Sequence, residues 1–155
     1  MDIPSILLGI LLFLIFLVPI FYVIFSNLSS EKKRLKTLAS LCKAQQIEIP
    51  TFEVIGNTFI GADRNKNFLV TADRFKVQET FQVIPINELV SVVVKANRAK
   101  NKSLDIVELD LIGKSFNKAI VFYDEDDDTN MADSEACLNE VNRWERTIKQ
   151  RLQTA

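Results

Sequence analysis

Hydrophobic residues run from Ile3 to Phe25 without an interrupting charge, and 17 of the 21 positions from Ser5 to Phe25 are Leu, Ile, Phe or Val. At a rise of about 1.5 Å per residue, such a helix is roughly 34 Å long, enough to cross a hydrocarbon core of about 30 Å. Burying these side chains in lipid favours insertion by roughly 5 to 10 kcal/mol. The pattern predicts a transmembrane anchor within residues 1–27.

A cleaved signal peptide and a buried core helix are the two alternatives for this segment. A signal peptide needs a basic start and a small-residue cleavage site, but Met1-Asp2 is acidic and residues 25–30 offer no such site. A core helix normally keeps a polar face, and this segment has none. The sequence therefore favours a single-pass membrane helix that is retained.

Charges next to the span predict its orientation. Asp2 precedes it, whereas a basic cluster follows it, formed by Lys32, Lys33, Arg34 and Lys36. The positive-inside rule then places the N-terminus outside the cell membrane and the C-terminal domain in the cytoplasm. The cluster would also lie against anionic lipid headgroups, although a topology signal explains it equally well.

Residues 28–49 have a helical pattern of their own, with Ser29 or Ser30 as a possible cap and an end near Gln46. Apolar residues recur there at coiled-coil-like spacing, at Leu28, Leu35, Leu38 and Cys42. One interpretation is self-association beside the membrane. The other, which we favour because the run is short, is a stripe that packs on the following domain.

From residue 50 to residue 155 the pattern changes to short β-rich runs and one final helix, which predicts an α+β domain. The last helix is expected from Asp133 or Ser134 to Leu152, with an apolar stripe that Glu145 interrupts. The short runs predict a curled antiparallel sheet of about seven strands, drawn from Phe52–Ile55, Thr58–Ala62, Phe68–Ala72, Phe75–Glu79, Phe81–Ile86, Leu89–Ala96, Ile106–Ile112 and Ala119–Tyr123.

Three pieces of this domain carry a family resemblance. The first is Phe68–Arg74, and the second is Val83–Val92. The third is Ala119–Tyr123, which an acidic loop and a helix with Trp144 follow. In this order the chain resembles the pleckstrin-homology-like (PH-like) barrel of bacterial PH and GRAM-like domains, and it is similar to uncharacterised bacterial single-pass membrane proteins. The resemblance implies a barrel closed by the C-terminal helix and a binding scaffold without catalysis; fold alone does not assign a function.

The composition of the chain limits the kinds of functional site that it can form. The net charge is −1, which gives nucleic-acid binding little support, and the absence of His removes Ser-His and Cys-His nucleophile pairs. No phosphate-binding glycine loop or nucleophile elbow is present, so we expect no cofactor and no enzyme activity. Cys42 and Cys137 match no metal spacing and should be reduced thiols in the cytoplasm.

The acidic loop after the last predicted strand is a candidate calcium site. Asp124, Asp126, Asp128, Asn130 and Glu135 occupy positions 1, 3, 5, 7 and 12 of an EF-hand frame. Two features oppose this interpretation: Thr129 stands where the sharp turn needs Gly, and a strand precedes the loop where a helix belongs. A solvated acidic loop that favours the start of the next helix is the alternative.

A second candidate site is cationic. Lys66, Arg74 and Lys76 resemble the basic spacing with which some PH domains bind phosphorylated lipid headgroups. The alternative is three solvated surface cations, because a turn near Arg74 separates them.

These features predict a membrane-tethered, cytoplasm-facing interaction module whose partners are the bilayer and an unknown protein. The basic loop Asn97–Ser103 and the acidic residues Asp124–Asp128 are candidate contact surfaces. The alternative is an accessory subunit of a larger membrane complex that acts through its transmembrane helix. A lipid-headgroup or calcium-responsive sensor would rest on the two candidate sites above.

Overall fold

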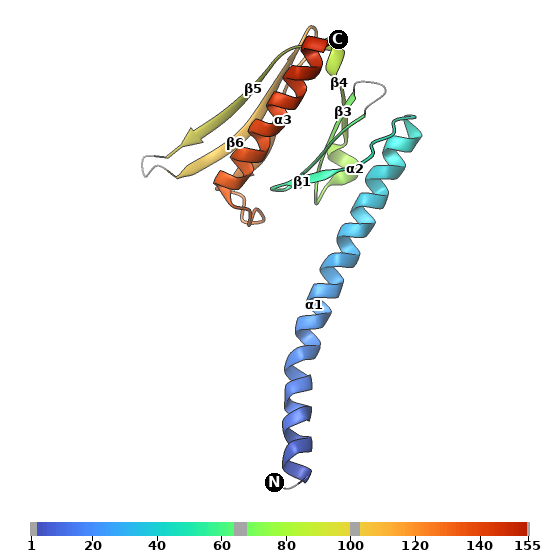
Figure 1. Ribbon diagram of the computed structural model, residues 1–155, viewed down its shortest axis with the longest axis vertical. Helices are drawn as coiled ribbons and strands as arrows, with labels where there is room; N and C mark the ends of the chain where they lie inside the picture. The colour runs from blue at the N-terminus through green and yellow to red at the C-terminus, as the bar shows by residue number, and fades with distance from the viewer. Residues whose placement is uncertain (1–2, 64–67, 100–102, 155) are drawn as a thin grey trace. The chain divides into compact units, whose positions relative to one another are not determined.

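The computed structural model describes residues 3–63, 68–99 and 103–154, and the chain divides into two compact units, residues 1–37 and 38–155 (Figure 1). The structure is of the α+β class, with an N-terminal apolar helix, antiparallel sheets and a C-terminal helix, as the sequence predicts.

The first element is one helix, α1 (Ile3–Ala44), which runs through Pro19 and is long and apolar enough to cross a membrane. The side chains of residues 9–25 are exposed or half-exposed in the structure, with Phe16 70% and Tyr22 73% accessible. The expected separate helix after Ser29 or Ser30 is wrong, since α1 is continuous there. A mid-helix Ser costs only a few tenths of a kcal/mol, whereas a break leaves several backbone groups without helical partners.

Helix α1 ends in a tight backbone motif. Gln46 has the left-handed φ of 57° that usually belongs to glycine, and its N–H donates to the carbonyl of Lys43 at 3.0 Å. The N–H of Ile47 donates to the carbonyl of Cys42 at 2.9 Å. Together these bonds form a Schellman cap, which satisfies the last carbonyls of the helix and turns the chain toward β1.

Seven strands in the described residues form two antiparallel sheets. The first has the order β1 (Glu53–Ile55), β2 (Thr58–Ala62), β3 (Phe68–Asp73) and β4 (Gln82–Pro85). The second has the order β5 (Leu89–Arg98), β6 (Leu104–Gly113) and β7 (Asn117–Asp124). A short helix, η1 (Ile86–Glu88), joins the sheets, and the described strands do not close into one barrel.

The expected strand at Phe75–Glu79 is wrong, because the chain forms the short helix α2 (Val77–Thr80) there. Asp73 is the reason: its Oδ1 accepts the backbone N–H groups of Phe75 at 2.7 Å and Lys76 at 3.0 Å. Thr80 completes the turn, since its hydroxyl accepts the N–H of Asp73 at 2.8 Å. Such side-chain bonds to the local backbone compete directly with a strand ladder.

The first sheet is buried on both faces. Ile60, Leu69 and Ile84 belong to the main core between the sheets and the last helix. Phe59 and Val70, which alternate with them along the strands, have no exposed surface. The opposite face is covered near Gly61, where an added Cβ would lie 2.7 Å from Ile49 and 2.8 Å from Phe52. A doubly buried sheet explains why the β2 and β3 sequences are apolar almost throughout.

The last helix, α3 (Ser134–Thr154), begins where expected and lies against β5 and β6 (Figure 1). Asp133 caps it, because its Oδ1 accepts the N–H groups of Glu135 at 2.9 Å and Ala136 at 3.1 Å. Val141, Trp144 and Ile148 of its predicted apolar stripe are buried in the main core, and Leu138 and Leu152 of the stripe are partly buried against it. Cys137, which lies beside the stripe, is buried in the same core.

The turn between β1 and β2 holds the two sheets together at the edge of β7. Gly56 has a φ of +56°, and a Cβ on it would lie 1.9 Å from the carbonyl oxygen of Phe122. That carbonyl accepts the side-chain amide of Asn130 at 3.1 Å, and the neighbouring carbonyl of Val121 accepts the Thr58 hydroxyl at 2.9 Å. Side-chain donors thus form hydrogen bonds to the β7 carbonyls of Val121 and Phe122.

Candidate functional site

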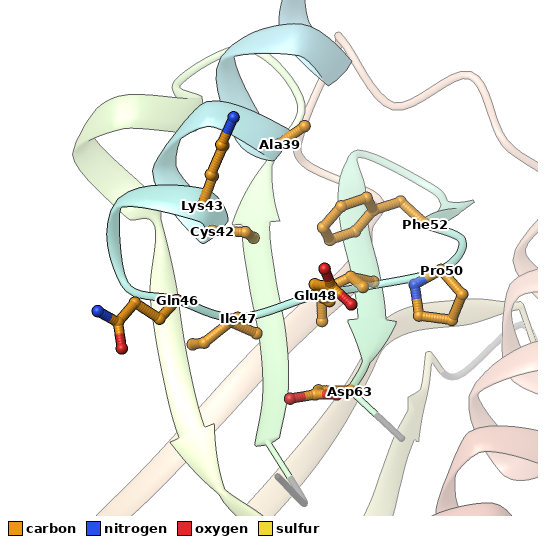
Figure 2. A pocket seen from close by; sticks show the side chains of 10 residues that line it. Ala39, Cys42, Lys43, Gln46, Ile47, Glu48, Pro50, Phe52 and Asp63 are labelled. Atoms are coloured by element: carbon orange, nitrogen blue, oxygen red, sulfur yellow. The ribbon is translucent and has the colours of Figure 1, made fainter. Parts of the chain in front are cut away.

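The 38–155 unit contains a pocket of about 750 Å³ on the outer side of the first sheet (Figure 2). Its walls come from the last turns of α1, the Schellman turn, the extended segment before β1, and the residue that follows β2. The lining residues are Ala39, Cys42, Lys43, Gln46, Ile47, Glu48, Ile49, Pro50, Phe52 and Asp63.

Most of the pocket wall is apolar and firmly held. Cys42 and Ile47 are 2% and 5% exposed, and Ile49 and Phe52 press against Gly61. Burial raises the pKa of the Cys42 thiol to about 11, because the thiolate would lose its hydration. Cys42 therefore contributes a small apolar surface to the pocket and not a nucleophile.

Polar groups lie at two places in the pocket. Lys43, Gln46 and Glu48 are exposed, whereas Asp63 is only 1% exposed. Figure 2 shows Lys43 and Ala39 at one end and Asp63 at the other. The backbone fixes Asp63, since its N–H donates to the Phe68 carbonyl at 2.9 Å and its carbonyl accepts Arg151 Nη1 at 3.1 Å. A largely apolar wall with a few polar groups is typical of small-molecule sites.

Sequence reasoning missed this pocket. It assigned Cys42 to a coiled-coil-like stripe and residues 47–49 to the end of the juxtamembrane segment, and it named Asp63 in no candidate site. The alternation of Ile47, Glu48 and Ile49 before Pro50 was the available signal of a segment with one buried side. The pocket itself depends on the turn at Gln46, which brings that segment back along the sheet.

The structure places the five candidate calcium ligands in separate local contacts. Asp124 Oδ1 accepts the N–H of Asp126 at 3.0 Å, and Asn130 is engaged with Phe122. Glu135 forms a 2.9 Å ion pair with Arg98, and Asp128 is exposed. In the described part of the chain no group of three or more acidic or cysteine side chains converges enough to hold a metal ion. Calcium binding by Asp124, Asp126, Asp128, Asn130 and Glu135 stays a prediction that would need this loop to rearrange.

Asp127, which is not one of the five candidate calcium ligands, connects this loop to the rest of the fold. Asp127 Oδ2 accepts the side-chain amide of Asn57 at 3.0 Å, and Thr129 Oγ1 accepts the same amide at 2.8 Å. The pKa of Asp127 is lowered chiefly by the hydroxyl of Thr129, which donates to Asp127 Oδ1 at 2.6 Å, then by the backbone N–H of Thr129 at 2.9 Å, and also by the Asn57 amide. The loop is thereby tied to the β1–β2 turn, which gives it a structural role.

The three candidate headgroup cations are not shown to converge. Lys66 lies outside the described residues. Arg74 is half-buried, with a buried Nε, and its backbone N–H donates to the carbonyl of Asn57 at 2.6 Å. Lys76 is exposed and stands at the start of α2. A headgroup site at Lys66, Arg74 and Lys76 therefore stays a prediction.

The basic cluster and the heptad residues both belong to α1. Lys32, Lys33 and Lys36 are exposed, and Arg34 is half-buried. Leu38 and Cys42 are buried in the 38–155 unit, at 0% and 2% exposure, as expected for a stripe that packs on the domain. Self-association through the remaining positions, Leu28 and Leu35, stays a prediction.

A pair of carboxylates on β6 is also accounted for by local contacts. Lys95 of the neighbouring strand forms an ion pair with Asp110, and its Nζ lies 3.7 Å from Glu108. The hydrogen bond to Asp110 is the main cause of the raised pKa of Lys95. This ion pair explains how Asp110 can be 8% exposed on a strand of the second sheet.

Comparison with protein-family models, with curated proteins and with solved structures finds no significant match for this chain.

Proposed function

We propose that the protein is a membrane-tethered, non-catalytic interaction module whose 38–155 unit faces the cytoplasm and binds a protein partner. The observation that carries this proposal is α1: an apolar segment with exposed side chains continues, without a helical break, into the first residues of a separately packed unit. Sixteen consecutive exposed or half-exposed positions from Ile10 to Phe25 would be costly in water and are stabilised in lipid.

The order of the elements supports a PH-like architecture for this unit. Four antiparallel strands, three antiparallel strands and a C-terminal helix follow one another, with the helix against the second sheet. Seven antiparallel strands followed by a C-terminal helix is the order that the sequence resemblance implies, and PH-like domains serve as scaffolds for binding surfaces. The PH-like assignment is part of our proposal, as is the absence of catalysis.

The tether limits where a partner can be found. Twelve residues separate Phe25 from Leu38, so the folded unit stays within a few tens of ångströms of the bilayer whatever its orientation. Confinement of this kind raises the effective concentration of a second membrane-bound molecule. A partner at the same membrane is accordingly the class we expect, and the basic cluster Lys32, Lys33, Arg34 and Lys36 would lie beside the cytoplasmic leaflet.

Topology is tested by cysteine labelling in a background that lacks native thiols, Cys42→Ala with Cys137→Ala. Met131 is 96% exposed, so Met131→Cys provides a reporter without disturbing the core. We expect an impermeant maleimide to label it only after the cells are permeabilised. Labelling in intact cells would place the domain outside and would contradict the proposal.

Partner binding is tested by cross-linking the full chain in native membranes, followed by purification in mild detergent and mass spectrometry. The matched variant replaces Ser5–Phe25 with a poly-Leu span and keeps the folded unit. We expect both proteins to capture the same partner through residues 38–155. Loss of the partner with the poly-Leu span would instead support the accessory-subunit alternative, in which the transmembrane helix itself makes the contact.

A further inference from the structure

We propose that the pocket at the end of α1 binds one linear alkyl chain, the hydrophobic part of a fatty acid or of a membrane phospholipid. The ligand is distinct from the protein partner, and only its supply from the bilayer rests on the proposed membrane tether. Asp63, at the base of the pocket, is closed to solvent and engaged within the chain, so the ligand is recognised by the other lining residues.

The pocket is large enough for a small molecule, and its lining is drawn out in one direction. Its volume of about 750 Å³ lies within the range of roughly 300 to 1,000 Å³ typical of ligand sites. Five of its lining residues belong to the extended segment 47–52, which spans at most roughly 20 Å. Figure 2 shows Ala39 and Lys43 of α1 at one end of the pocket and Asp63 at the other. A guest that follows the extended segment is therefore a linear one.

The surface that such a guest can reach is mostly apolar. Ala39 and Pro50 are exposed, and Ile49 and Phe52 are half-buried, so all four keep apolar surface open to the pocket. Cys42 adds no charge behind them, because burial raises the pKa of its thiol to about 11. Burial of each methylene group against such walls strengthens binding up to about four-fold.

The exposed polar residues of the lining do not select a charge on the ligand. Lys43 contributes one positive charge and Glu48 one negative charge, and water screens both because both side chains are exposed. A headgroup of either sign can stay in water beside them while the alkyl chain lies on the apolar walls. A sugar or a free phosphate, by contrast, needs several converging hydrogen-bond partners.

The membrane tether would keep the pocket near a reservoir of alkyl chains. Twelve residues separate Phe25 from Leu38, where the folded unit begins. A fatty acid can leave the bilayer as a free molecule, whereas a phospholipid would have to raise one chain out of its leaflet, which costs the burial of that chain in lipid. One ligand chemistry thus has two sources, and the probes below separate them.

Photo-crosslinking of the full chain in lipid nanodiscs tests the site. The probes are dodecanoate, dodecyltrimethylammonium and a dodecanoyl phosphatidylcholine, each with the same diazirine in its chain. Mass spectrometry of a tryptic digest then compares label on residues 37–43 and 44–64, which carry the lining, with label on the peptide that carries the apolar part of α1. We expect dodecanoate and the ammonium probe to label the lining within about five-fold of each other, because the exposed charges contribute little. Unlabelled dodecanoate should displace both from the lining, and not from the apolar part of α1.

The two regions of label distinguish failure of this site from failure of the tether. Label confined to the apolar part of α1 would overturn the alkyl site and leave the tether intact. Lining label without label on the apolar part of α1 would contradict the tether and support the site. Lining label from phosphatidylcholine as well would identify the bilayer lipid as a source, whereas its absence would identify the free fatty acid.

Ala39→Phe locates the site, because it places a ring at the exposed end of the pocket and removes no core contact. It should lower the lining label about ten-fold, the effect expected if about two methylene groups lose their burial. The matched control is Ala136→Phe, at an exposed alanine of α3 outside the lining, which should leave the label unchanged. Unchanged lining label in the Ala39 variant, or an equal loss in the Ala136 variant, would overturn the assignment.

Discussion

The carboxylate of Glu145 on α3 accepts a hydrogen bond from the backbone N–H of Val94 on β5, with 3.2 Å between nitrogen and oxygen. The same carboxylate forms a 2.9 Å ion pair with Lys149 one turn later. In the described part of its sheet β5 is an edge strand, since the strand order is β5-β6-β7. Glu145 thus occupies a backbone donor that an edge strand would otherwise offer to another chain.

Removal of the Glu145 carboxylate should destabilise the 38–155 unit and expose the edge of strand β5. For Glu145→Ala we expect a loss of about 1 to 2 kcal/mol in the free energy of unfolding, the cost of a part-buried N–H that loses a charged acceptor. The single Trp144 is buried beside Glu145 in the core, so its fluorescence reports the denaturant midpoint. Sedimentation of the same sample should show concentration-dependent association, because the edge N–H of Val94 becomes available to a second strand.

The control for Glu145→Ala is Asn139→Ala, at an exposed position of the same helix. It should change the midpoint by less than about 0.5 kcal/mol, as is usual for surface positions. Similar losses for both variants, without association of the Glu145 variant, would contradict the edge-protection role.

Glu145 also shows what the sequence can and cannot predict. The apolar stripe on α3 is predictable because helical periodicity is a local property of the sequence. From the sequence, Glu145 is only a polar interruption of that stripe. Its partner Val94 is 51 residues away, and no local pattern announces that pairing. The same holds for Trp144, whose indole N–H donates to Glu53 Oε2 at 2.9 Å across 91 residues.

The strand wrongly expected at residues 75–79 and the pocket that the sequence did not predict both depend on individual turn residues. Residues 75–79 belong to the series of short β-rich runs that predicts strands, but the carboxylate of Asp73 caps a turn there, which the composition of the run does not indicate. The pocket escaped notice because it depends on one left-handed residue, Gln46, a residue type seldom found in that conformation. The transmembrane segment was predicted from composition and length alone, which suffice when the solvent is lipid.

Gly56 is a position where any side chain should be damaging. The Gly56→Ala change puts a Cβ 1.9 Å from the Phe122 carbonyl oxygen and demands a positive φ of an L-residue. The clash is with backbone of β7 that Asn130 also holds, so it cannot relax cheaply. We expect a loss of about 3 kcal/mol or more in unfolding free energy, seen as an early Trp144 fluorescence transition.

The matched control for Gly56 is Gly9→Ala, since a Cβ at Gly9 meets nothing within 4 Å and stands in a helix. That variant should be neutral for the folded unit, because the change lies in the apolar part of α1. A Gly56→Ala protein with the wild-type midpoint would mean that the β1–β2 turn does not contact β7 in solution.

At Gln46, in contrast to Gly56, the glycine variant should be the more stable protein. Its φ of 57° is strained for a residue with a Cβ, and glycine removes that strain at the C′ position of the cap. The relieved strain is about 1 to 2 kcal/mol, and the added freedom of the unfolded chain offsets about half of it, so Gln46→Gly should raise the free energy of unfolding by about 0.5 to 1 kcal/mol. Gln45→Gly is the control: Gln45 has no positive φ, so glycine there adds freedom to the unfolded chain and should lower stability by about 0.5 to 1 kcal/mol. Equal effects of the two glycines would rule out the Schellman cap.

The Cys42 thiol should make stability depend on pH in the alkaline range. Its pKa is raised from 9.0 to about 11 in the folded protein, so between these values the unfolded chain releases a proton that the folded chain keeps. The folded state then binds more protons, and the free energy of unfolding falls as pH rises from about 9 to 11, while this contribution is constant below about pH 8. Lys and Tyr residues titrate in the same range, so the measurement is the difference in denaturant midpoint between wild type and Cys42→Ala as a function of pH. That difference should be constant up to about pH 8 and should shrink above pH 9; a difference independent of pH up to 11 would show that the Cys42 thiol reaches water, and that the wall of the pocket is open there.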